Sequence, residues 1–332
     1  MNIEKHFSEI YSLIIEARNN VLKSVNKELI ELYWRIGEYI SKKVHQSNWG
    51  ENVVQQLADY LKSQEPDLKG FSAQNLWRMR QFYEVYHDNE KLSPLVRELS
   101  WTNNLLILSK TKTAEEKEFY IRLSVKERYS KRELERQIDS GYFERTMIPD
   151  KSFTPKIKKL YPNIDEVLKD NYVLDFLKLP KDYDERDLQK AILRNLKDFI
   201  LEIGKDFTLL GEEYRLQVGK KDFNIDLLFF HRELQCLVAI ELKIQEYKPE
   251  FMGKMDFYLE TLDATIKKPH ENPSVGIILC KSKDADVVEF SLRRSISPAM
   301  IAEYETKLID KKILRDKLNE LFQLAEGNSK KE

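Results

Sequence analysis

Two acidic side chains and a lysine interrupt the most apolar stretches of the chain. Asp226 precedes a run of leucine and phenylalanine, and Glu241 and Lys243 lie two residues apart just after Leu237–Ile240. Side chains two apart on a strand point to the same face of a sheet. If the two runs pair through the short polar turn His231–Glu233, Asp226 approaches Glu241. The sequence therefore predicts two carboxylates and an ammonium group on one central sheet.

This set of side chains suits the hydrolysis of a phosphate ester. Buried charges of this kind are costly unless they are paired or bind a cation. Carboxylate oxygens are suitable ligands for Mg²⁺ or Mn²⁺, and such a metal polarises a phosphate and lowers the pKa of a bound water. Lys243 would then orient that water or stabilise the charge that develops on the phosphate. The alternative is an exposed ion pair on a half-buried strand, worth at most about 1 kcal/mol, and the spacing alone leaves both interpretations open.

The second half of the chain supplies the elements that position these groups. Short polar turns separate three strand-like runs, which indicates an antiparallel meander. A later apolar run, bounded by Pro273 and Lys281, is typical of a buried central strand. The predicted strands are Tyr214–Val218, Phe223–Phe230, Gln235–Lys243 and Ser274–Cys280. The predicted helices are Glu185–Ile203, Gly253–Lys267 and a helical tail at Glu305–Ala325. Together they form a mixed α/β domain.

The first 145 residues are predicted to be all-helical. Apolar residues recur at intervals of three and four from Ile3 to Val44, and a second helix is predicted near Glu51–Lys62. Ser72 can cap a third helix, and the pair Ser130 and Glu133 fits a capping box. The overall fold class is therefore α+β, with a helical domain over 1–145, a proline-containing linker over 146–163, the α/β domain over 164–326 and a polar tail over 327–332.

Composition limits the classes of protein that fit. The 332 residues include 55 basic and 56 acidic side chains, which argues against a polybasic, non-specific nucleic-acid binder and leaves a local basic patch open. Cys236 and Cys280 lie in apolar runs, as expected of thiols in a reducing compartment. No apolar run approaches the roughly 20 residues that span a bilayer. We therefore expect a soluble, cytoplasmic protein without a membrane partner.

The run from Asp226 to Glu241-Leu242-Lys243 resembles the signature of the PD-(D/E)XK nuclease superfamily. Similarity to the YhcG-like branch of these nucleases covers nearly the whole chain. The segments that carry it are Leu32–Gly37, Gly70–Tyr83, Tyr142–Arg145, Asp222–His231, Ile240–Lys243 and Asn272–Lys281. The resemblance implies a restriction-endonuclease-like core that hydrolyses phosphodiester bonds in DNA with Mg²⁺, for which Mn²⁺ can substitute. Asp226 and Glu241 would bind the metal, and Lys243 would position the attacking water.

The resemblance also implies further site residues. Glu202 matches an additional acid that the first helix often supplies, although a solvated glutamate at a helix end fits the spacing equally well. Arg215 matches a strand that approaches the site, or it is a surface residue. In RecB-like members the helix after the lysine strand carries Gln-x-x-x-Tyr. Tyr258 fits this pattern, whereas Lys254 replaces the glutamine, so it contacts a phosphate or weakens catalysis.

Polar side chains on one predicted helix of the first half offer a second route to nucleic acid. Gln74, Asn75 and Arg78 lie away from the apolar stripe, and such residues read the grooves of DNA. The break Ser63–Phe71 is too long for a tight helix-turn-helix. The alternative is a packed domain that forms a homodimer or binds a partner protein. For the whole chain, the alternative to a nuclease is a catalytically weak DNA-binding or scaffold protein, and the sequence leaves RNA open as the substrate.

Overall fold

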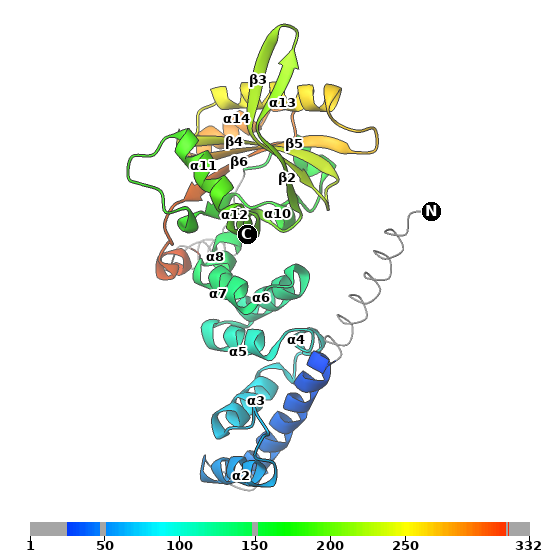
Figure 1. The fold of residues 1–332 in the computed structure, drawn as a ribbon, viewed down its shortest axis with the longest axis vertical. Coiled ribbons are helices and arrows are strands. Elements are labelled where there is room, and N and C mark those ends of the chain that lie inside the picture. The colour runs from blue at the N-terminus through cyan, green and yellow to red at the C-terminus, as the bar shows by residue number, and fades with distance from the viewer. Residues whose placement is uncertain (1–24, 47–50, 148–151, 317, 319–332) are drawn as a thin grey trace, which may run out of the picture. The chain divides into compact units, whose positions relative to one another are not determined.

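The computed structural model describes residues 25–46, 51–147, 152–316 and 318 (Figure 1). Contacts divide the chain into two compact units, one that ends at Asp139 and one that begins at Ser140. No helix within the described ranges has both the length and the apolar composition needed to cross a bilayer.

The first unit is all-helical throughout its described part, as the sequence predicts. A helix over 25–46 is followed by α2 (Glu51–Gln64), α3 (Ala73–Tyr86), α4 (Ser93–Val96), α5 (Trp101–Lys110), α6 (Ala114–Glu127) and α7 (Lys131–Asp139). The Ser72 hydroxyl accepts a hydrogen bond from Asn75 N–H and caps α3. Ser130 and Glu133 form both bonds of the predicted capping box. The predicted helical residues 3–24 lie outside the described residues.

A close helix contact explains one glycine of this unit. A Cβ atom at Gly37 would lie 2.1 Å from the backbone oxygen of Met79, so only glycine allows the first helix to approach α3 this closely. Trp34 packs edge-on against Phe82 beside this contact, with 5.6 Å between ring centroids. Aromatic packing of this kind forms the core of the helical unit.

The second unit contains a six-stranded mixed sheet in the order β1-β6-β5-β4-β3-β2. The strands are β1 (Asn171–Val173), β2 (Phe207–Val218), β3 (Lys221–His231), β4 (Cys236–Glu246), β5 (Asn272–Ser282) and β6 (Ala299–Glu305). Strands β2, β3 and β4 pair as the predicted antiparallel meander, and β4 pairs with β5 in parallel. Strand β4 is therefore central, with neighbours on both sides.

Helices cover both faces of this sheet. On one face α11 (Glu185–Arg194) and α12 (Leu196–Ile203) pack on the core that includes Phe229 and Ile240. On the other, α13 (Glu250–Thr265) and α14 (Ala285–Leu292) pack on the core that includes Leu228 and Ala239 (Figure 1). The smaller helices of this unit are α8 (Tyr142–Met147), α9 (Pro155–Leu160), α10 (Ile164–Val167) and the 3₁₀ turn η1 (Asp175–Leu177). The predicted α+β class, with a mixed α/β second domain, is confirmed.

The structure differs from the expected linker over 146–163. Phe153 forms a β-bridge to Met300, and Thr154 caps α9, where Ile157 is fully buried. Pro155 therefore begins a helix, because proline is well tolerated in the first turn. This part of the segment is folded onto the sheet and belongs to the second unit, which begins at Ser140.

Two further predictions about elements were wrong. The helix predicted over Glu185–Ile203 is interrupted at Asn195, whose side-chain amide donates to Ala191 O and competes with the helical bonds. The helical tail predicted from Glu305 does not begin there, because Glu305 is the last residue of strand β6, which the sequence did not predict. A helix resumes over 311–316, and residues 317 and 319–332 lie outside the described residues.

Candidate active site

The register of the sheet brings the two predicted carboxylates together. The antiparallel ladder ends at the pair of Leu227 on β3 and Ile240 on β4, and Asp226 and Glu241 are the next residues beyond it, close enough for the charge of Glu241 to act on Asp226. The backbone N–H of Leu242 donates to Asp226 Oδ2 over 2.7 Å and fixes that carboxylate against the β4 backbone. The pairing inferred from the short turn between the two apolar runs is therefore confirmed.

Glu241 lies at the centre of a buried cluster of charges. Its residue is 1% exposed, and its Oε1 lies 3.1 Å from Lys243 Nζ and 2.5 Å from Lys254 Nζ. Its second oxygen, Oε2, is buried without a hydrogen-bond partner in the described part of the chain. A buried carboxylate oxygen of this kind is costly unless a proton, a water or a cation binds it. Glu241 thus presents one satisfied oxygen and one available oxygen.

Asp226 experiences the charge of Glu241. Burial and then the negative charge of Glu241 raise the pKa of Asp226 to about 6, against a partial opposing effect of Leu242 N–H, Lys243 and Lys254. The charge of the neighbouring Glu241 carboxylate favours a proton on Asp226, and a bound cation would relieve the same repulsion. Asp226 and Glu241 therefore form a site with unmet negative charge at neutral pH.

This cost predicts that Asp226→Asn stabilises the metal-free protein at neutral pH. The folded protein holds the Asp226 proton more tightly than the unfolded chain, so the charged form destabilises the fold above pH 6. The cost disappears as the pH falls from about 6 towards the ordinary value of 3.8. The difference of about 2 units between the pKa of Asp226 in the folded and the unfolded protein corresponds to a loss of at most about 3 kcal/mol in the free energy of unfolding. Thermal unfolding in EDTA should show a higher melting temperature for Asp226→Asn than for the wild type at pH 7.5, and no such difference at pH 4.

Asp222→Asn is the matched control for this measurement, since Asp222 lies on the same strand and is exposed. Its substitution should leave the melting temperature nearly unchanged at both pH values. If Asp226→Asn melted at a lower temperature than the wild type at pH 7.5, the charged Asp226 carboxylate would not destabilise the metal-free fold, and the prediction would be wrong.

Helix α11 contributes two polar side chains that the sequence reasoning missed. Lys243 Nζ donates to Glu185 Oε2 over 3.0 Å, and Gln189 Nε2 donates to the backbone oxygen of Asp226 over 2.8 Å. Residues 185 and 189 lie one turn apart and share a face of the helix. That spacing is readable in the sequence, but only the packing of α11 on the sheet shows that this face meets β3 and β4.

Lys243 is held as a charged ammonium group. Burial alone would lower its pKa, but the negative charge of Glu241 and the hydrogen bond to Glu185 outweigh burial and raise the pKa above the ordinary value. The residue is only 8% exposed, and its Nζ also donates to Leu242 O. A lysine in this state acts as a hydrogen-bond donor and an electrostatic stabiliser, not as a general base.

Glu202 does not lie with these groups, contrary to the expectation that it supplies a third acid. It is fully buried on α12, and its Oε1 accepts hydrogen bonds from Arg145 Nη1 and from the Val173 N–H of β1. Strand β1 is three strands away from β4, about 14 Å at the usual strand spacing. Glu202 therefore anchors the sheet edge, and Glu185 occupies the place that the sequence assigned to Glu202.

Arg215 and Tyr258 have different environments. The Arg215 side chain is 64% exposed and pairs with Asp222 at 2.8 Å on the β2–β3 hairpin, which projects from the sheet (Figure 1). Tyr258 is 1% exposed, and its hydroxyl donates to Asn224 O over 2.5 Å. That bond ties α13 to β3, so Tyr258 positions the helix that carries Lys254, and Arg215 remains a surface residue.

The three predicted contact residues on α3 separate into two kinds. Gln74 and Arg78 are exposed. The Asn75 side chain is committed to the fold, since it donates to Gly70 O and accepts a hydrogen bond from Trp101 Nε1. Its substitution would disturb the packing of the helical unit, so Asn75 is unsuited to groove readout.

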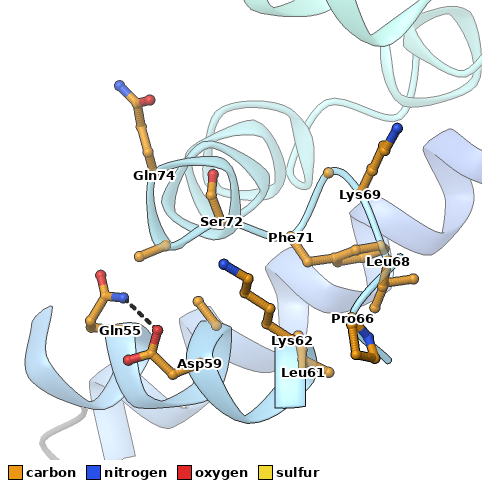
Figure 2. Close-up of a pocket in the computed structure, with 13 residues that line it drawn as sticks. Gln55, Asp59, Leu61, Lys62, Pro66, Leu68, Lys69, Phe71, Ser72 and Gln74 are labelled. Carbon is orange, nitrogen blue, oxygen red and sulfur yellow. Dashed lines mark hydrogen bonds between the residues drawn. The ribbon is translucent and has the colours of Figure 1, made fainter. Parts of the chain in front are cut away.

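A hollow of about 470 Å³ lies between α2 and the start of α3, with Gln74 among its lining residues. Figure 2 shows Lys62 extending from α2 toward Ser72. Gln55 and Asp59, which lie on α2 as Lys62 does, are hydrogen-bonded to each other. This region offers polar groups for a ligand, but nothing in it identifies one.

Asp226 and Glu241 fit a divalent metal that keeps several waters. The described residues hold no group of three or more His, Cys, Asp or Glu side chains arranged around one metal position. Mg²⁺ is commonly bound by one or two carboxylates, waters and substrate phosphates, which requires no third acid. The unpartnered Glu241 Oε2 and the repulsion between the two carboxylates supply the ligand and the charge.

Comparison with known proteins agrees with this architecture. Residues 165–319 match the family model described as the YhcG PDDEXK nuclease domain, and residues 9–145 match the DUF1016 N-terminal domain. The Escherichia coli (strain K12) protein named "Putative nuclease YhcG" is 31% identical, over 93% of this chain and 92% of its own. Proteins with this nuclease domain generally use divalent metal ions.

Two solved structures show weak similarity. A repair endonuclease from Pyrococcus abyssi matches with a TM-score of 0.27 and 18% identity, over 37% of this chain and 50% of that chain. A structure described as EndoMS in apo form matches with a TM-score of 0.26 and 18% identity, over 37% and 48%.

Residues 165–319, which contain most of the helix-covered mixed sheet, are a PDDEXK nuclease domain. The chain as a whole belongs to the YhcG family of PD-(D/E)XK nuclease-domain proteins.

Proposed function

We propose that this protein is a metal-dependent nuclease that hydrolyses phosphodiester bonds in DNA. The observation that carries the proposal is the unpartnered, buried Oε2 of Glu241 opposite Asp226, because it offers a ligand position at a point of unmet negative charge. Mg²⁺ is the ion that these two carboxylates suit, and Mn²⁺ can substitute for it. Membership of a nuclease family supports the reaction class.

Each side chain of the site has a distinct part in this proposal. Asp226 and Glu241 hold the ion, which when bound lowers the pKa of water and polarises the scissile phosphate. Lys243 Nζ contacts Glu185, Leu242 O and Glu241, and it would exchange one of these contacts for a hydrogen bond that orients the attacking water, while its charge stabilises the phosphate. Glu185 therefore replaces Glu202 as the third acid, in the role of orienting Lys243.

Lys243→Met should separate metal binding from hydrolysis. Methionine keeps most of the side-chain volume but removes the donor, so we expect DNA cleavage to fall by about 10²–10³, as when an electrostatic donor is lost from an active site. The thermal stabilisation by Mn²⁺ should persist, because Asp226 and Glu241 remain. Cleavage rates and melting temperatures of the same preparation test this directly. If Lys243→Met cleaved DNA at the wild-type rate, Lys243 would have no part in hydrolysis.

The substrate class is tested with labelled nucleic acids of different structure. Linear, nicked, branched and single-stranded DNA, and an RNA of matching sequence, are incubated with the wild-type protein in Mn²⁺, in Mg²⁺ and in EDTA. We expect cleavage of at least one DNA in either metal and none in EDTA. If only RNA were cleaved, the protein would be a ribonuclease and not a deoxyribonuclease. Cleavage in EDTA would contradict the metal dependence of the reaction.

A catalytically weak DNA-binding or scaffold protein is the second candidate. It is favoured by the contact between Lys254 and Glu241, since an ammonium group already neutralises part of the site. Such a protein would bind DNA with a salt-dependent affinity that does not respond to metal. The exposed side chains of Gln74 and Arg78 would then belong to the surface that contacts DNA. The helical domain would form a homodimer or bind a partner protein.

A further inference from the structure

We propose that Lys254 is a built-in counter-ion that competes with the metal for Glu241, so that metal binding is coupled to the arrival of a DNA phosphate. The proposal rests on the proposed function, because it assumes that Asp226 and Glu241 are the metal ligands. It adds a regulatory contact to that site: the Lys254 charge at Oε1 of Glu241 weakens metal binding at the neighbouring Oε2 until the substrate is present.

The geometry shows that Lys254 reaches the site from outside the sheet. It extends from α13, whereas Glu241 and Lys243 both lie on β4. The Lys254 side chain is 45% exposed, and the Glu241 side chain that it contacts is 2% exposed. The ammonium group therefore covers the solvent side of an otherwise buried carboxylate.

The two lysines at Glu241 are not equivalent. The Lys243 side chain is 10% exposed and is fixed by Glu185 as well as by Glu241. Lys254 bonds Glu241 Oε1 and also lies 5.3 Å from the centroid of the Tyr258 ring. Because its stem is long and half in solvent, Lys254 can leave Glu241 by rotating its side chain, and Lys243 cannot.

Charge determines when Lys254 leaves. Without metal, its ammonium group offsets the repulsion between Asp226 and Glu241. A divalent ion between those carboxylates would lie near a like charge, and this repulsion opposes metal binding. A phosphate of bound DNA offers Lys254 another acceptor at the rim of the site. DNA and metal should then each raise the affinity for the other, as linkage requires.

The test compares Mn²⁺ binding by calorimetry in wild type, Lys254→Gln and Lys248→Gln. Lys248 precedes α13 and is exposed, so its substitution makes the same change of charge without touching Glu241. We expect Lys254→Gln to bind Mn²⁺ at least about tenfold more tightly than the wild type, with Lys248→Gln unchanged. No cleavage is needed for this measurement.

A second titration adds a short duplex with uncleavable phosphorothioate linkages. The duplex should tighten Mn²⁺ binding to the wild type and have a smaller effect on Lys254→Gln, which already lacks the opposing charge of Lys254. Equal Mn²⁺ affinity in all three proteins would overturn the proposal that Lys254 opposes metal binding, and it would not affect the proposed function. Absence of Mn²⁺ binding to every protein would overturn both.

Discussion

Glu241→Gln should abolish metal-dependent cleavage of DNA, with a loss of at least about a thousandfold, because it removes the charge that binds the ion and fixes Lys243. The substitution keeps the shape of a side chain that is 1% exposed, so the strand packing is preserved. It should also remove the rise in melting temperature on addition of Mn²⁺, a rise that depends on ligand concentration relative to Kd. Cleavage rates and thermal unfolding with and without Mn²⁺ provide the two measurements.

Glu246→Gln is the control, since Glu246 lies at the exposed end of the same strand. It should cut DNA and respond to Mn²⁺ as the wild type does. If Glu241→Gln retained wild-type cleavage, Glu241 would be a structural ion-pair partner of Lys243 and Lys254, and the catalytic site would have to lie elsewhere.

Arg145→Met should destabilise the sheet unit by about 3–5 kcal/mol, because it leaves the buried carboxylate of Glu202 without its main counter-charge. The two side chains are 3% and 0% exposed and lie 3.2 Å apart. Arg145 also donates to Ser140 O and to Asn171 O, so one substitution removes several bonds. Chemical denaturation measures the loss, and hydrogen exchange of Val173 N–H, which donates to Glu202, locates it at β1.

Arg186→Met is the matched change at an exposed position of the same unit and should alter stability by less than about 0.5 kcal/mol. Adding Glu202→Met to Arg145→Met should recover part of the loss, because the fully buried carboxylate is then removed together with its main partner. A loss of DNA cleavage by Glu202→Gln in a protein of unchanged stability would contradict the structural role of Glu202 and restore it to the active site.

The sequence predicted those parts of the site that depend on strands. Alternation places Glu241 and Lys243 on one face of β4, and the short turn between β3 and β4 brings Asp226 opposite Glu241. Both inferences rest on local rules of strand geometry and of tight connections. The antiparallel meander and the central buried strand β5 followed from the same rules.

The helical contributions to the site could not be predicted in this way. Glu185 and Glu202 both lie on helices predicted as one, and either could face the sheet until the break at Asn195 and the packing of α11 and α12 are known. The buried partner of Glu202 is Arg145, which is 57 residues away in sequence. Contacts of that range follow from tertiary packing, and no periodicity in one sequence reveals them.

Anomalous diffraction from crystals soaked in Mn²⁺ tests the central claim most directly, because it locates the ion without reference to activity. We expect a peak beside Glu241 Oε2, where a carboxylate oxygen of Asp226 would be a second ligand. Soaked crystals of Glu241→Gln should lack this peak. Ordered Mn²⁺ bound to other residues, with none between Asp226 and Glu241, would contradict the assignment of these two carboxylates as the metal site.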